Sequence, residues 1–239
     1  MTVSNSLETR MLEYEAVPKL TLTKRMPLII RLDGRAFHTW TRGLDKPFCD
    51  TLTFEMQRAT QRTLREISGA KLAFLFSDEI SILITDYDAL NTEAWFNKEV
   101  MKLCSVSASK FTAYFNLLWH NEGHYDRNGL ATFDARCFVL PKEEVANYFI
   151  SRQKDAERNS VNALAQSHFS HKSLQGLKNS ELQEKLFLEK SVNWNDLETW
   201  KKRGSCVIRT ENGFEIDDNI PVFSQDRNYI EHFVILETV

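Results

Sequence analysis

Two pairs of residues that border apolar runs, Asp33-Gly34 and Asp78-Glu79, are the strongest candidates for chemistry. Asp33 follows the apolar run of residues 26–32 and precedes Gly34, and Asp78-Glu79 separates two further apolar runs. Carboxylates that lie close together repel each other unless a proton or a cation lies between them. Mg²⁺ uses one or two carboxylates together with substrate phosphates, and two such ions can clamp the oxygens of a phosphoryl displacement. If the fold joins the two pairs, they predict magnesium-dependent phosphoryl transfer.

Each pair also has a plain structural interpretation. Asp33-Gly34 alone is typical of a turn after a strand, and Asp78-Glu79 alone is typical of a hairpin tip. With no side chain at Gly34, a triphosphate or a metal ion could approach the backbone closely. The choice between turn and site depends on whether the fold brings the pairs together.

The order of the expected elements does bring them together. Apolar periodicity and turn residues predict a strand, a helix, two strands, a helix and a strand, at residues 26–32, 50–67, 71–76, 80–85, 92–119 and 132–140. This β-α-β-β-α-β order is the ferredoxin-like pattern of an α+β protein, with an antiparallel sheet and its helices on one face. Right-handed crossovers place the first and third strands side by side and antiparallel. Asp33 and Asp78 should therefore share one edge of the sheet.

The rest of the chain predicts a helical and mixed extension. Residues 142–165 and 181–190 have helical character, and 207–216 is a hairpin around Asn212-Gly213. We expect a catalytic domain at residues 1–140 and an extension at 141–239 that packs on it.

Composition restricts the class of protein. The 239 residues are 42% hydrophobic and 26% charged, with a net charge of −3, so any nucleic-acid surface would be local. The four cysteines form no C-x-x-C pair, which favours free thiols in a reducing compartment over a zinc site. No apolar run reaches about 18 residues. We therefore expect a cytoplasmic protein that does not span a membrane.

Several short sequence motifs resemble those of the tRNA-His guanylyltransferase family, including its Thg1-like branch. In chain order they are RLDGRAFH at 31–38, KP at 46–47, SDEIS at 77–81, SAS at 107–109 followed by Phe111, FDAR at 133–136 and RQ at 152–153. The resemblance covers about residues 10–165 and is looser beyond them.

The resemblance implies a polymerase palm that works in the opposite direction, adding nucleotides to the 5′ end of tRNA after ATP or GTP activates that end. It implies two Mg²⁺ ions, held by Asp33, Gly34 and Asp78, with Glu79 as a further catalytic residue, and a homotetramer. The implied nucleotide-binding residues are Asp33, Gly34, Arg35, Ala36, Phe37, His38, Lys46, Asp50, Ser77, Asp78 and Lys102. The tRNA-binding candidates are Arg152, Asn159, Lys201, Lys202 and Arg203.

One departure bears on the substrate. Family members specialised for tRNA-His carry His-Ile-Asn-Asn after the Arg-Gln pair, whereas residues 157–160 here read Glu-Arg-Asn-Ser. This favours template-dependent repair of 5′-truncated tRNAs over the addition of G at position −1, which stays an alternative. A cyclase-like palm and a non-catalytic RNA-binding module with a vestigial palm are further alternatives. RLDGRAFH disfavours the cyclase, and the intact Asp33-Gly34 and Asp78-Glu79 pairs disfavour the vestigial palm.

Overall fold

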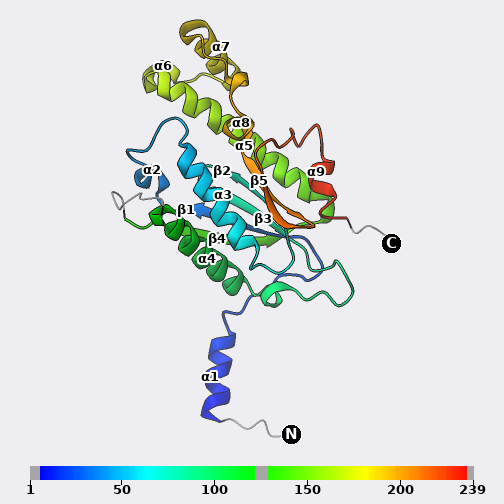
Figure 1. Cartoon of the computed structure of the whole chain (residues 1–239). Coiled ribbons are helices and arrows are strands. Elements are labelled where there is room, and N and C mark those ends of the chain that lie inside the picture. Colours follow the sequence, from blue (N-terminus) through cyan, green and yellow to red (C-terminus); the bar gives the residue numbers. More distant parts are fainter. Residues whose placement is uncertain (1–5, 122–128, 236–239) are drawn as a thin grey trace.

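The computed structural model describes residues 6–121 and 129–235, whose strands form one antiparallel sheet. Its six strands lie in the order β4-β1-β3-β2-β5-β6 (Figure 1). They are β1 (Leu28–Gly34), β2 (Ala70–Phe76), β3 (Glu79–Ile84), β4 (Phe133–Val139), β5 (Ser205–Thr210) and β6 (Gly213–Asp217). The first four have the ferredoxin-like order, with β1 and β3 adjacent as predicted. The α+β fold class is therefore confirmed.

Helices α3 (Asp50–Leu64) and α4 (Val100–Asn121) cover one face of the sheet, and α5 (Lys142–His168) covers the other (Figure 1). Helix α7 (Asn179–Lys190) packs against α5. Shorter ones are α1 (Leu7–Ala16), α2 (Phe37–Trp40), η1 (Trp95–Lys98), α6 (His171–Leu174), η2 (Trp194–Asp196), α8 (Thr199–Arg203) and α9 (Asn228–Glu231). None of the helices in the described part of the chain is both long and apolar enough to cross a bilayer.

Alternate residues of the central strands pack into different cores. Ile30 and Leu32 of β1 join the core beneath α3 and α4, whereas Ile29 joins the core beneath α5. Because successive side chains of a strand point to opposite faces, this alternation fixes which face each polar residue occupies. Helices α3 and α4 share one face of the sheet, as predicted, and α5 from the extension covers the other face.

Helix α4 begins later than its apolar pattern predicts. The pattern predicts a start at residue 92, but α4 starts at Val100, because Phe96, Asn97 and Lys98 all have positive φ. The buried Lys98 ammonium is 3.1 Å from Asp86 Oδ1 and also donates to the backbone oxygens of Thr23 and Met26. This buried pair replaces the helical turn that the periodicity suggested.

The C-terminal hairpin extends the sheet. β5 pairs with β2, and β6 pairs with β5 through the turn at Asn212-Gly213, where Gly213 has a φ of 120°. The predicted hairpin turn is thus confirmed. The pairing of this hairpin with β2 could not be predicted from the sequence. The division of the chain at residue 140 stays a prediction.

An aromatic cluster under α4 is the expected source of much of the palm's stability. It contains Phe37, Trp40, Phe111, Phe115, Trp119 and Phe133. We expect Phe115→Ala to lower the free energy of unfolding by about 3–5 kcal/mol, since the fully buried ring would leave a cavity. Urea denaturation measures this change. Leu117→Ala on the same helix is the control, because that side chain is 50% exposed; equal losses would contradict the core assignment.

Candidate active site

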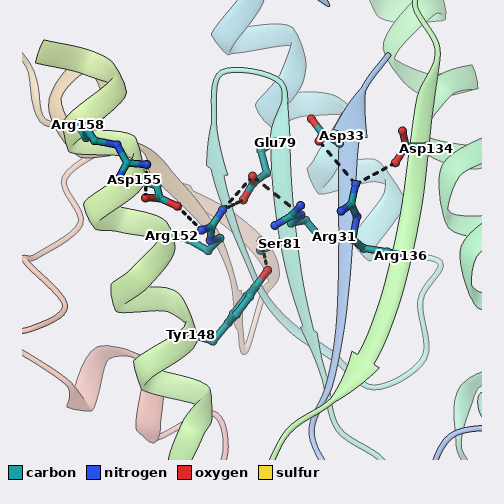
Figure 2. A network of polar contacts seen from close by, with 10 residues as sticks. All are labelled: Arg31, Asp33, Glu79, Ser81, Asp134, Arg136, Tyr148, Arg152, Asp155 and Arg158. Carbon is teal, nitrogen blue, oxygen red and sulfur yellow. Dashed lines mark hydrogen bonds and ion pairs between the residues drawn. The ribbon is translucent and has the colours of Figure 1, made fainter. Parts of the chain in front are cut away.

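Strand register lines up three carboxylates at one end of the sheet. Asp33 on β1 lies opposite Glu79 on β3 and opposite Asp134 on β4. Partners in register point to the same face, so the three acids form a row across three strands (Figure 2). Asp33 stands in the middle of this acidic row and is 39% exposed.

A basic row lies next to the acidic row, further from the ends of the strands. It consists of Arg31, two residues before Asp33 on β1, and Arg136, two residues after Asp134 on β4, and the two arginines are in register. Arg136 approaches both Asp33 at 4.0 Å and Asp134 at 3.7 Å, and Arg31 Nε lies 4.0 Å from Glu79. These cations reduce the repulsion within the acidic row and leave its outer side open.

Helix α5 adds a chain of ion pairs to Glu79. Arg152 lies 3.2 Å from a Glu79 oxygen and also contacts Asp155, which in turn lies 2.6 Å from Arg158 (Figure 2). Glu79 therefore points toward Arg31 and Arg152. Its visible role is to hold these two guanidinium groups beside the acidic row.

Asp78 occupies the tight turn between β2 and β3. Ser77 has a φ of 55°, an uncommon conformation for a residue other than glycine, and its hydroxyl donates to Asp78 Oδ1 at 2.9 Å. Burial raises the pKa of Asp78 above its ordinary value of 3.8, and the charges of Asp33 and Glu79 raise it further. A carboxylate in these surroundings is stabilised by a nearby cation.

Gly34 is required by close packing rather than by an unusual φ. A Cβ atom there would lie 2.3 Å from the Phe37 ring and 2.8 Å from Asp78 Oδ2. The absence of a side chain thus lets the Asp78 carboxylate lie against β1, next to Asp33. Gly34 therefore allows the carboxylates of Asp33 and Asp78 to share this end of the sheet.

A cavity of about 410 Å³ opens beside the carboxylates. Asp33, Ser77, Asp78 and Lys46 line it together with Arg152. Many of its other lining residues are apolar: Leu44, Pro47, Phe48, Leu52, Met56, Phe74, Leu75, Phe76 and Trp200. Its volume and its mixture of charged and apolar walls are typical of a site for a small polar ligand.

The predicted nucleotide-binding residues divide between this cavity and other places. Asp33, Lys46, Ser77 and Asp78 line it, and Gly34 touches Asp78. Phe37 is buried in the aromatic cluster. Arg35, Ala36, His38 and Asp50 do not line the cavity.

Lys102 lies in a different pocket. It shares that pocket with Arg25 and Asp86, beyond the C-terminal end of β3, and forms an ion pair with Glu99 at 3.3 Å. Asp78 precedes the opposite end of the same strand. Within one chain, Lys102 therefore belongs to neither the cavity nor the carboxylate cluster.

The predicted tRNA-binding residues form two groups. Arg152 and Asn159 line the cavity from α5. The basic residues of α8 have acceptors within the chain: Lys201 lies 3.3 Å from Asp50, Lys202 donates to the Asn195 oxygen at 2.7 Å, and Arg203 lies 3.9 Å from Glu157. The pairing of Lys201 with Asp50 joins α8 to the start of α3.

Sequence reasoning missed several cavity residues. Phe48, Gln57, Asp155 and Trp200 line the cavity but carry no motif that marks them, and Arg158 is marked only as part of residues 157–160. Trp200 precedes the basic cluster that the sequence did single out, so only its neighbours gave a signal.

The residues present fit a hard divalent cation better than a transition metal. The described residues contain no group of three or more His, Cys, Asp or Glu side chains arranged to bind a metal. Mg²⁺ does not need such a group, because substrate phosphates and water complete its six oxygen ligands. The partly buried Asp78 next to Asp33 supplies the carboxylates that this arrangement requires.

More than half of the chain matches the model of a known protein family. Residues 8–141 match the model of the tRNAHis guanylyltransferase family. The chain is thus a nucleotidyltransferase. It belongs to the tRNAHis guanylyltransferase family, as the sequence motifs predicted.

Two solved structures are similar over nearly the whole chain. Both are bacterial tRNA(His) guanylyltransferase (Thg1)-like proteins. The complex with ATP is 48% identical, with a TM-score of 0.93, and the complex with GTP is 42% identical, with a TM-score of 0.84. Each match covers 97% of this chain and 100% of the other. A probable tRNA(His) guanylyltransferase of Dictyostelium discoideum is 27% identical over 79% of this chain and 77% of its own length.

The raised pKa of Asp78 predicts a pH-dependent stability difference. Protonation of Asp78 favours the folded state, so its contribution is complete below pH 3.8 and is lost as the pH rises through the native pKa. We expect Asp78→Asn to be more stable than the wild type at pH 7 in EDTA, with a gap that shrinks as the pH falls. Urea denaturation from pH 7.5 to 5 measures the gap.

The exposed residue Asp226 supplies the matched control for this series. Asp226→Asn should follow the wild type at every pH. If Asp78→Asn were no more stable than the wild type at pH 7, Asp78 would not be the desolvated carboxylate of this site.

Proposed function

We propose that the chain is a template-dependent nucleotidyltransferase that adds nucleotides in the 3′-to-5′ direction to the 5′ end of truncated tRNAs. The observation that carries the proposal is the cavity that Asp33, Asp78, Lys46 and Arg152 share. It combines carboxylates suited to Mg²⁺ with cations suited to phosphates, and similar proteins are found in complex with ATP and with GTP.

The proposed reaction has two phosphoryl transfers. The 5′-monophosphate of the tRNA attacks the α-phosphorus of ATP or GTP, and pyrophosphate leaves. The 3′-hydroxyl of an incoming nucleoside triphosphate then attacks the 5′ phosphate, and the mononucleotide leaves. The next residue is thereby joined to the tRNA through its own 3′ oxygen.

The chain's own groups would position these reactants. Asp33, the Gly34 carbonyl oxygen and Asp78 would hold two Mg²⁺ ions, which neutralise developing negative charge when bound. Lys46 is a point charge for the triphosphate. The Ser77 hydroxyl keeps the Asp78 carboxylate in place through its 2.9 Å hydrogen bond.

Residues 157–160 support repair over the tRNA-His-specific reaction. Glu157 lies 3.9 Å from Arg203, and the Ser160 hydroxyl donates to the Lys201 oxygen at 2.6 Å and accepts from Trp194 Nε1 at 2.9 Å. These side chains therefore pack α5 against its neighbouring segments in the place of the His-Ile-Asn-Asn motif. Arg152, Asn159 and residues 201–203 remain the proposed tRNA contacts. A homotetramer and a cytoplasmic location rest on the resemblance and the composition.

A 5′-extension assay tests this function. The substrate is a tRNA that lacks its first nucleotide and carries a 5′-monophosphate, with ATP, Mg²⁺ and each nucleoside triphosphate in turn. We expect addition of only the base complementary to the opposing acceptor-stem nucleotide. Addition of G to full-length tRNA-His, whatever base opposes it, would instead support the guanylyltransferase alternative.

Two variants locate the reaction in the cavity. Asp33→Ala should reduce extension by at least about a hundredfold while the protein stays folded, because the charge-stabilising site is lost. Asp226→Ala, at an exposed position, is the control and should keep wild-type rates. Near-normal extension by Asp33→Ala would contradict the assigned site, and no extension of either RNA by the folded wild type would contradict the proposed function.

A further inference from the structure

A buried glutamine forms part of the wall of the active-site cavity. Gln57 lies on α3 and is 4% exposed, and none of the motifs or roles described above includes it. Its amide nitrogen donates to Ser205 Oγ at 2.9 Å and to Asp218 Oδ1 at 2.5 Å. Both bonds cross from α3 to the C-terminal hairpin region, so the side chain is held in one orientation.

The two acceptors determine which end of the amide faces the cavity. An amide carries two N–H donors on nitrogen and only acceptors on oxygen, and an ionised carboxylate can only accept. The nitrogen of Gln57 must therefore face Asp218, which turns Oε1 away from it. Within residues 6–121 and 129–235, no donor is hydrogen-bonded to Oε1, and Oε1 is not among the fully buried unpaired atoms. The oxygen is thus an acceptor with accessible surface, on a residue that lines the cavity.

The surroundings of Gln57 suit a nucleobase rather than a phosphate. Neighbouring cavity residues on the same helix are Leu52 and Met56, and the rings of Phe48 and Trp200 lie 6.4 Å apart in an edge-to-face pair. Flat apolar groups pack well against such walls. The charged residues Asp33, Asp78 and Lys46 would take the triphosphate, which leaves the apolar part of the cavity for the base.

We propose that Gln57 determines base recognition in this cavity, with its Oε1 accepting a hydrogen bond from the exocyclic amino group of a purine nucleoside triphosphate. The inference rests on the proposed function and deepens it. Adenine carries such an amino group at position 6 and guanine at position 2. Because a buried acceptor left without a donor is costly, a purine without the amino group should bind more weakly.

Matched nucleotides test the contact directly. Calorimetry with the full chain compares ATP with purine riboside triphosphate, and GTP with inosine triphosphate; each second nucleotide lacks only the amino group. We expect about tenfold weaker binding of the analogue in at least one pair, and the affected pair identifies the base that Gln57 recognises. In Gln57→Leu, the ratio for that pair should fall close to one. A purely structural role would weaken both members of the pair equally and leave the ratio unchanged.

Gln61→Leu is the matched control. Gln61 lies one turn further along α3, donates to the Phe214 oxygen at 2.7 Å and does not line the cavity, so this variant should keep the wild-type ratio. If thermal melting shows that Gln57→Leu does not fold, Gln57→Met, which preserves the length of the side chain, takes its place. If the wild type binds both members of each pair equally, or if the folded Gln57 variant keeps the wild-type ratio, the inference about Gln57 is overturned and the proposed function is not. If the folded wild type binds neither ATP nor GTP, both the inference and the proposed function are overturned.

Discussion

The antiparallel register of β1 and β3 is the constraint on which the site depends. It sets Asp33 against Glu79, and the register of β1 with β4 adds Asp134 to this acidic row and sets Arg31 against Arg136 on the same face. A shift of one residue would turn the acids of one strand to the other face, toward the core under α3 and α4. The buried alternation of Ile29 and Ile30 excludes that shift, because each occupies a different core. The hydrophobic pattern of the strands therefore positions the carboxylates.

The site contains residues that destabilise the folded state and arginines that partly offset this destabilisation. Asp78 is held at a turn where burial and two neighbouring acids raise its pKa, and the adjacent Ser77 has positive φ. Arg31, Arg136 and Arg152 compensate only the inner side of the acidic row. The negative charge that remains faces the cavity, where the proposed Mg²⁺ ions and triphosphate would complete the balance. Strain and repulsion of this kind are expected where binding rather than stability has been favoured.

Sequence reasoning predicted the four-strand order and the meeting of Asp33 with Asp78, since both follow from periodicity and the handedness of crossovers. It placed the start of α4 too early, because an apolar pattern does not reveal the positive φ values around Lys98. The role of Lys102 in nucleotide binding stays a prediction, because within one chain this residue lines a different pocket, together with Arg25 and Asp86. Gln57 could not be found, because its role depends on contacts with Ser205 and Asp218, which are distant in the chain and enter the cavity wall only in the folded state.

We propose that Asp33 and Asp78 together hold divalent cations for a bound nucleoside triphosphate. Titration with Mn²⁺ as a paramagnetic substitute for Mg²⁺, followed by electron paramagnetic resonance with a non-hydrolysable ATP analogue present, tests it without requiring catalysis. We predict saturable Mn²⁺ binding by the wild type and affinity at least about tenfold weaker in both Asp33→Asn and Asp78→Asn. Wild-type Mn²⁺ affinity in either folded variant would contradict the account.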